Sequence, residues 1–223
     1  MAPPAATPMP EPARPEAAQI LASWFSPAYP VGAYSYSHGL EWAVEAGTVA
    51  NRADLAAWVA DLLRHGAGRS DAILLAQAHA AEDPAELAEL AEALAPSAER
   101  HLETMAQGGA FARTTAAVWG LDLPAMPYPV AAGRAARLLD LPLGATLVLY
   151  LQGFAANIIS AGVRLIPLGQ TDGQRVTAEL MPLCAEIAAE AARATLDDLG
   201  GAALGADLAA MLHETQYTRL YRS

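Results

Sequence analysis

The chain contains no lysine: all 13 of its basic residues are arginine, against 24 Asp and Glu, for a net charge of −11. Without lysine it can form no Schiff base and use no lysine general base. An ordinary Walker A loop is also excluded, since its lysine must reach the β- and γ-phosphates. The acidic balance argues against binding nucleic acid or an anionic membrane surface. The sequence therefore predicts a protein that does not itself hydrolyse nucleotides.

Cysteine is nearly absent as well. Cys184 is the only one, so no intrachain disulfide and no cysteine cluster for zinc can form, which favours a reducing cytoplasm. Its apolar neighbours indicate an inert core thiol. No two of the five histidines are spaced i, i+3 or i, i+4, so no helical pair of metal ligands is present. We predict no metal site and no cofactor, although a site built from distant histidines, or across a dimer, stays open.

Strand patterns are scarce, and apolar residues recur at helical spacing nearly throughout. We predict an all-α fold, a single compact domain of about eight to ten helices around a central buried helix. That helix is the apolar stretch 141–166, whose length would also suit a membrane span, but it is interrupted by several polar residues and glycines. The expected divisions are a disordered lead-in (1–15), an all-helical body (16–212) and a C-terminal tail (213–223).

One stretch, at residues 26–41, is unusually rich in proline, glycine, tyrosine and serine. Its sequence is SPAYPVGAYSYSHGLE. Its prolines bar a helix, and Ser35 or Ser37 is predicted to N-cap the helix that follows. Gly39 inside that helix indicates close packing against another backbone. Both a rigid buried turn and a shaped contact surface fit this pattern.

The same stretch raises an alternative function, a small helical hydrolase using Ser35 or Ser37 with His38. Adjacent residues on a helix point about 100° apart, so Ser37 and His38 are badly placed to hydrogen-bond. The Gly-x-Ser-x-Gly elbow of hydrolases is also missing. We therefore predict a protein that is not an enzyme.

Two further segments stand out. The run NIISAGVRLIPLGQT at 157–171 embeds polar groups among apolar ones, and we interpret it as an internal hydrogen-bond network bracing the core. The tail, HETQYTRLYRS, places Tyr217, Leu220 and Tyr221 on one face if it is helical, and adds Arg219 and Arg222 to an acidic protein. Aromatic residues and arginine are typical anchors of protein interfaces, so the tail is predicted to dock on a partner or on the body.

Together these three segments resemble the urease accessory protein UreF family, over about residues 20–223. The stretch at 26–41 is similar to the family's Ser-Pro-x-x-Pro-Val-Gly-Gly-Phe/Tyr-Ser-Tyr-Ser-x-Gly-Leu-Glu, except that Ala33 stands where a second glycine is usual. The run from Asn157 is similar to Asn-Leu-Val-Ser-Ala-x-Val-Arg-Leu-x-Pro-Leu-Gly-Gln-Thr-x-Gly-Gln. The tail is similar to His-Glu-Thr-Gln-Tyr-x-Arg-Leu-Phe-Arg-Ser.

The resemblance implies a non-enzymatic, homodimeric chaperone for nickel insertion. It would bridge the accessory protein UreD (also called UreH) and the GTPase UreG and act with them on apo-urease. Nickel and GTP would belong to the partners, and the tail would order when UreD binds. The predicted partner-binding residues are Tyr217, Arg219, Leu220, Tyr221 and Arg222 of the tail, with Pro30, Gly32, Tyr34, Ser35, Tyr36 and Glu41 of the stretch at 26–41 as a second candidate surface that contacts the tail.

Overall fold

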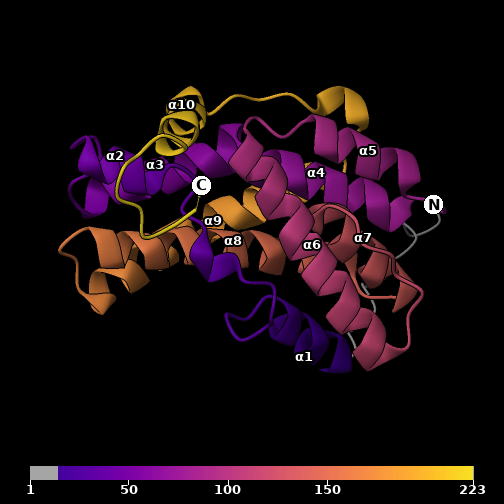
Figure 1. Ribbon diagram of the computed structural model, residues 1–223. Coiled ribbons are helices and arrows are strands. Elements are labelled where there is room, and N and C mark those ends of the chain that lie inside the picture. Colours follow the sequence, from indigo (N-terminus) through magenta and orange to yellow (C-terminus); the bar gives the residue numbers. More distant parts are fainter. Residues whose placement is uncertain (1–14, 223) are drawn as a thin grey trace, which may run out of the picture.

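The computed structural model describes residues 15–222. Of the lead-in expected at 1–15, residues 1–14 lie outside the described part, and Pro15 is the first residue of a helix. Over residues 15–222 the fold is all-α, as predicted, with no named strand and one isolated β-bridge (Figure 1). Its ten helices are α1 (Pro15–Trp24), α2 (Leu40–Glu45), α3 (Arg52–His65), α4 (Ala67–Ala80), α5 (Ala85–Ala93), α6 (Ala98–Trp119), α7 (Tyr128–Leu138), α8 (Leu143–Leu165), α9 (Gln170–Ala191) and α10 (Leu204–His213). Two short 3-10 helices are η1 (Ala33–Ser35) and η2 (Leu196–Asp198).

Helix α8 is the central element of this bundle. It packs against α9, α4, α3, α2 and α1, which come from both halves of the chain. It is also the one described helix long and apolar enough to cross a membrane, yet half of its apolar window is buried inside the protein. Ser160 and Arg164 stay exposed, so one stripe of α8 faces outward and the helix is not buried on all sides.

Local capping signals explain several helix starts. Asn51 caps α3 by accepting hydrogen bonds from the amides of Ala53 and Asp54, and Ser97 caps α6 by accepting from Arg100. The predicted cap of α2 by Ser35 or Ser37 is wrong, since its N-cap is Gly39, at φ +73° and with no side-chain cap.

Helix α6 changes the character of its buried face along its length. Leu102 near its start is 53% exposed, whereas Phe111 further along is fully buried. The inward positions near the start of α6 are instead Arg100, Glu103 and Gln107, which are all buried. These polar side chains contact partners inside the bundle. The buried face of α6 is therefore polar near the start of the helix and apolar further along.

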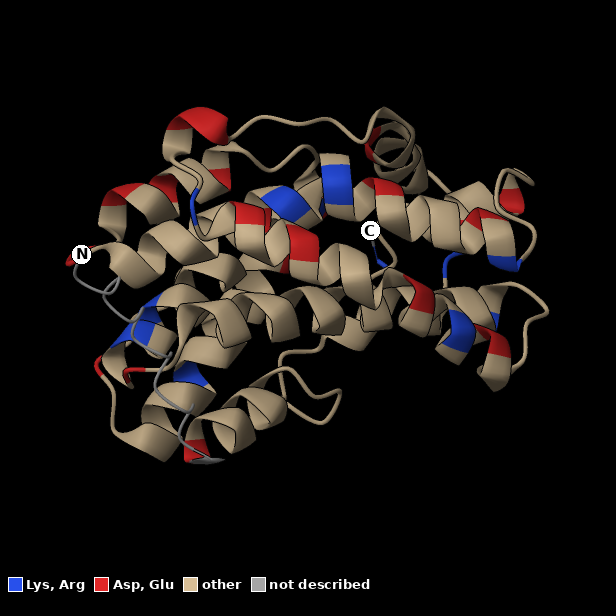
Figure 2. Ribbon diagram, turned by 180° about the vertical axis from the view of Figure 1, so that it is seen from behind, with Lys and Arg blue, Asp and Glu red and all other residues tan. Residues whose placement is uncertain are grey.

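The far end of the described chain returns to its beginning. In Figure 1 the yellow segment after α10 crosses the body and ends among α2, α8 and the indigo residues that precede α2. Acidic residues spread over many helices in the opposite view, with fewer arginines among them (Figure 2). The tail therefore brings Arg219 and Arg222 onto a body with an acidic balance.

Candidate partner-binding site

The tail pairs directly with the stretch that precedes α2. Tyr36 and Arg222 form an isolated parallel β-bridge. The amide of Arg222 donates to the carbonyl of Ser35 (2.7 Å), and the amide of Ser37 donates to the carbonyl of Arg222 (2.8 Å). The two segments singled out in the sequence thus lie side by side, as the predicted contact between them requires.

Glu41, in the first turn of α2, anchors the tail backbone. Its carboxylate accepts hydrogen bonds from the amides of Leu220 (2.7 Å) and Tyr221 (2.9 Å). It also lies 3.0 Å from Nε2 of His213, the last residue of α10. A carboxylate that is only 6% exposed needs such partners, because a buried charge without hydrogen bonds is costly.

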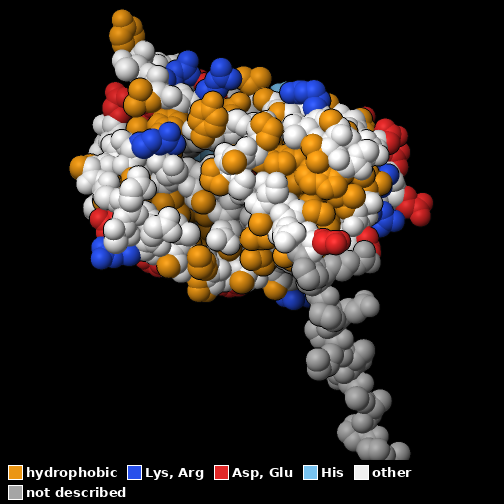
Figure 3. Space-filling view, turned by 90° about the horizontal axis from the view of Figure 1, so that it is seen from below, with side chains coloured by type: hydrophobic (Ala, Val, Ile, Leu, Met, Phe, Trp, Pro, Cys, Tyr) orange, Lys and Arg blue, Asp and Glu red, His pale blue; other side chains and the backbone are white. Residues whose placement is uncertain are grey.

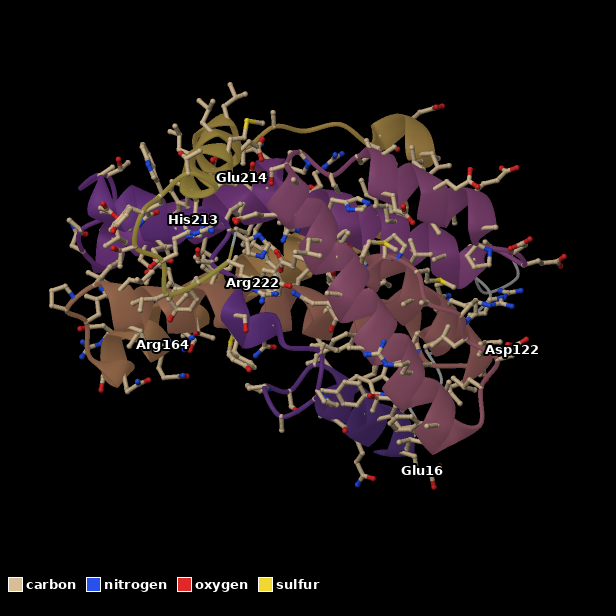
Figure 4. The ribbon with its side chains drawn as sticks, viewed as in Figure 1. Glu16, Asp122, Arg164, His213, Glu214 and Arg222 are labelled. Carbon is tan, nitrogen blue, oxygen red and sulfur yellow. The ribbon has the colours of Figure 1, made fainter. Side chains whose placement is uncertain are left out.

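A second carboxylate, Glu99 of α6, completes this contact. Its Oε2 lies 3.1 Å from Nδ1 of His213, and its Oε1 accepts a hydrogen bond of 2.5 Å from Arg219. Figure 4 shows His213 and Arg222 along the path of the tail, with Arg164 on the neighbouring α8. Two acidic side chains from distant helices therefore hold one histidine and one arginine of the C-terminal segment.

Tyr221 is the buried aromatic anchor of the tail. It is 8% exposed, and the guanidinium carbon of Arg164 lies 5.0 Å from its ring centroid, a cation–π contact. Burial raises the pKa of Tyr221 above its usual value. The interpretation of Arg164 as part of an internal network is wrong, because this side chain is exposed and meets the tail from outside.

The predicted single face of the tail is also wrong. Helix α10 ends at His213, and the residues after it form turns. Tyr217 is fully exposed and Leu220 is 78% exposed, whereas Tyr221 is buried. The amides of Leu220 and Tyr221 bond to Glu41 instead of to carbonyls four residues earlier, which prevents a helix there.

The residues predicted for partner binding therefore divide into two groups. The exposed ones are Tyr217, Arg219, Leu220, Arg222, Tyr34 and Pro30. Of these, Arg219 also binds Glu99, and the backbone of Arg222 pairs with residues 35–37. The remainder hold the tail or shape the turn: Tyr221, Gly32 at φ +76°, Ser35, Tyr36 and Glu41.

An exposed apolar stripe on α10 adjoins the tail and was missed by the sequence analysis. Leu204 and Leu208 are 69% and 59% exposed, and Met211 and Leu212 are each more than 40% exposed. The spacing i, i+4, i+7, i+8 places them on one face of the helix. The opposite face carries Ala206, Ala209 and Ala210, whose small side chains permit close packing against α2. The sequence does contain a signal for this stripe, because α10 carries apolar residues on two faces, and a helix at the surface buries only one of them.

Behind the turn at 26–34 lies a cavity of about 310 Å³, closed on its other side by α8. Its lining includes several aromatic side chains together with the polar ones of His38, Asp71 and Arg100. The side chains of Arg100, Glu103 and His38 form a buried ionic cluster, in which Nε2 of His38 lies 3.3 Å from Glu103 and Arg100 donates to the same carboxylate. This cluster was not predicted from the sequence, although the spacing of Arg100, Glu103 and Gln107 places them on one helix face.

Burial and neighbouring charges shift the pKa values of this cluster and of the nearby Asp71 in different directions. Burial opposes the charge on Glu103, but the adjacent Arg100 outweighs it and lowers the pKa of Glu103 to about 2. Burial raises the pKa of Asp71 to about 6, even though Tyr150 donates a hydrogen bond to it (2.8 Å). Burial, assisted by the positive charge of Arg100, lowers the pKa of His38. At neutral pH the cluster therefore holds an ion pair beside a neutral imidazole.

The geometry does not supply the serine–histidine pair of a hydrolase. Oγ of Ser37 and Nδ1 of His38 are both buried and have no hydrogen-bond partner, and Nε2 of His38 faces Arg100 and Glu103 instead. Among residues 15–222, no group of three or more His, Cys, Asp or Glu side chains is arranged to hold a metal ion.

Comparison with known proteins shows which family and which proteins this chain is similar to. The profile of the family described as UreF matches residues 49–181. A protein of Cereibacter sphaeroides (strain KD131), named urease accessory protein UreF, is 58% identical, over 91% of this chain and 97% of its own length. Proteins of the same name from Ruegeria pomeroyi (50% identical, 91% of this chain, 95% of their own) and Methylobacterium sp. strain 4-46 (53%, 92% and 88%) are also similar.

Proposed function

Because the chain belongs to the UreF family of urease accessory proteins, we propose that it is a non-enzymatic chaperone for nickel insertion that bridges UreD and UreG. In this role it holds the two partners in one geometry while they act on apo-urease. The chaperone contributes by orienting the two partners and by raising their effective concentration. Nickel and GTP are handled by the partners, and the protein works in the cytoplasm.

The observation that carries this proposal is the exposed apolar surface at the C-terminal end of the chain. It comprises the α10 stripe (Leu204, Leu208, Met211, Leu212) and the exposed Tyr217 and Leu220 of the docked tail, which follows α10 directly in the chain. Several large apolar side chains exposed on neighbouring segments are typical of protein interaction sites. The tail beneath them is fixed by Glu41, so the surface is presented in one arrangement. We assign this surface to UreD.

Homodimer formation is part of the same proposal. Hydrophobic side chains also gather on the face seen from below, the side on which α1 lies (Figure 3). This face is separate from the C-terminal surface, so a second copy and UreD can bind together.

Co-purification with the candidate partners tests the proposal. We expect tagged UreD to capture the full-length protein, and UreG to join the complex in a manner that depends on GTP. Replacing Leu208 and Tyr217 by Ala should weaken capture by UreD at least tenfold, because both side chains are exposed and their loss leaves the fold intact. Leu196→Ala, a substitution of another exposed leucine far from the tail, is the matched control.

Removing residues 216–223 should abolish capture while helical circular dichroism is retained, because the deletion begins after α10 has ended. A truncated protein that still recruits both UreD and UreG contradicts the role of the tail. Failure of the full-length protein to bind either one contradicts the bridging function as a whole.

A further inference from the structure

The cavity behind the turn at 26–34 extends from the surface into the body of the protein. Its volume of about 310 Å³ is near the lower end of the range for small-molecule sites. Among its lining residues, Pro30 and Tyr34 are exposed, whereas Arg100 and Glu103 are buried. The cavity therefore has room for a small molecule and opens beside the turn.

Several polar groups in this lining have no partner inside the protein. Within the part of the chain that the structure describes, no hydrogen bond is made by the hydroxyl of Tyr128, the side-chain amide of Asn157 or Oδ1 of Asp71. The side-chain nitrogen of Gln107 donates to Glu103 (2.7 Å), but its side-chain oxygen accepts no bond from these residues. A few uncommitted polar groups in a mainly apolar cavity are what orients a small-molecule ligand.

The charges of the lining favour a cation. Arg100 and Glu103 form an ion pair, and His38 is neutral at about pH 7.5 because burial lowers its pKa. The remaining charged group is Asp71, whose pKa is raised by burial to about 6, so its carboxylate is ionised at the same pH. No ion pair within residues 15–222 neutralises this charge, and the lining is therefore net negative. An unpaired carboxylate in a cleft costs stability and is typical of a functional site.

Aromatic rings lie close to this carboxylate. Tyr150 donates a hydrogen bond to Oδ2 of Asp71 (2.8 Å), and the ring centroid of Tyr128 lies 5.4 Å from that of Tyr150. Phe25 and Phe154 line the same cavity. The faces of aromatic rings carry partial negative charge and attract organic cations, and a carboxylate binds the cationic group through charge-assisted hydrogen bonds. Both features of the lining thus favour the same kind of ligand.

We propose that this cavity binds a small organic cation, an ammonium or guanidinium group on a short apolar stem, with the charged group on Asp71 and the stem against the aromatic lining. The cation supplies the partner that the carboxylate lacks. A free amine and a lysine or arginine side chain of a partner protein offer the same chemistry. The site lies within this chain and does not depend on the assignment of UreD to the C-terminal surface.

A titration of the full-length protein with butylammonium at about pH 7.5 tests the site, followed by the NMR signals of the amides of residues 153–157. The matched neutral and anionic probes are 1-butanol and butyrate. We expect butylammonium to bind at least tenfold more tightly than either, the range of one charge-assisted hydrogen bond. An affinity for butylammonium no higher than for the other two probes, or no shift at residues 153–157, would overturn the proposal.

Asp71→Asn removes the negative charge and keeps an acceptor for Tyr150. It should weaken butylammonium binding at least tenfold and leave 1-butanol binding unchanged. Asp61→Asn changes an exposed carboxylate of α3 that does not line the cavity, and this matched control should bind as the wild type does. Unchanged butylammonium binding by Asp71→Asn contradicts the proposal. If this variant does not fold, the comparison of the three probes on the wild type decides the question.

Capture by tagged UreD and UreG distinguishes the two sources of the cation. If the occupant is a side chain of either partner, an excess of butylammonium should reduce capture, and so should Asp71→Asn. If the occupant is a free amine, capture should be unchanged. Either result, together with probe binding, supports the site and assigns its occupant. Probe binding is measured on this chain alone, so it stands or fails separately from the bridging function.

Discussion

Gly39 stands so close to α10 that a Cβ atom built on it would lie 2.8 Å from the backbone nitrogen of Ala210 and 2.9 Å from the carbonyl oxygen of Ala206. Its φ of +73° is also in the left-handed region that favours glycine. A close backbone contact was predicted for this glycine from the sequence, and the structure confirms it. Through this contact the start of α2 fixes α10, and with it the position from which the tail departs.

Gly39→Ala should therefore lower the free energy of unfolding by about 2–4 kcal/mol, the sum of left-handed strain and overpacking. Gly32→Ala is the matched control. Gly32 has nearly the same φ, +76°, but an added Cβ there meets nothing within 4 Å. Its cost should be limited to about 1–2 kcal/mol of strain. Urea unfolding of both variants measures the difference, and equal losses would show that contact with α10 adds nothing.

Asp71 gives a prediction on pH. Its pKa is raised by burial to about 6 in the folded protein, above the value of an exposed Asp. The folded state therefore favours the protonated form, and the stability from this site is fully present below about pH 4 and lost as the pH rises through about 6. Asp71→Asn keeps an acceptor for Tyr150 without the charge. At pH 8 it should be more stable than the wild type by about 1–3 kcal/mol.

Thermal unfolding of both proteins between pH 4 and pH 8 measures this effect. The advantage of Asp71→Asn should disappear at the acidic end of the range, where the wild-type carboxyl is protonated. A variant less stable than the wild type at every pH would show that the charge of Asp71 supports Arg100 more than its burial costs.

Glu103 has the opposite dependence. Burial opposes its charge, but Arg100 lowers its pKa to about 2, so its contribution to stability is present above about pH 4.5 and lost as the pH falls toward 2. Glu103→Gln leaves Arg100 buried without its main partner and should cost about 3–5 kcal/mol at pH 7.

The matched control for Glu103 is Asp172→Asn. It breaks an ion pair of the same i, i+3 spacing with Arg175, but on an exposed face, and should cost less than about 1 kcal/mol. Chemical denaturation of the two variants at pH 7 compares them. Similar losses would contradict the assigned role of the buried cluster.

Cys184 should be unreactive in the folded protein. It is 3% exposed, and burial raises the pKa of its thiol to about 11, so almost no thiolate is present at pH 8. We expect a disulfide reagent to modify it at least a hundredfold more slowly in buffer than in denaturant. Fast modification of the native protein would mean that α9 opens locally around this residue.

The helices and the tail contact were predictable because their signals are local or lie in recognisable motifs. Periodic apolar residues define a helix without knowledge of its neighbours, and Asn51 and Ser97 cap helices through bonds that span two or three residues. Ser35 and Ser37 have the same capping chemistry, yet neither caps α2. The positive φ angles of His38 and Gly39 turn the chain just before the helix and point it at α10, and the sequence does not reveal this turn.

The polar interior was not predictable for a related reason. Arg100 and Glu103 look like surface residues in a helix, and they are buried because His38 and Asp71 come from other elements to meet them. Likewise, His213 acquires its partners from residues 172 and 114 positions away in the chain. Sequence patterns predict helix faces and helix caps, which depend on neighbouring residues. Whether a charged side chain is buried depends on which distant groups the fold brings close to it.

The contacts of α2 also have a consequence for how the protein opens. The close packing of Gly39 joins this short helix to α10, and the hydrogen bonds of Glu41 join it to the tail. Both contacts are therefore lost if α2 detaches from the bundle. Segments from opposite ends of the described chain then form one cooperative unit of local unfolding, with the packed bundle α3–α9 as another. Amides in α2, α10 and residues 220–222 should share one opening free energy, below that of α8. The interaction surface would thus be gained or lost as a whole.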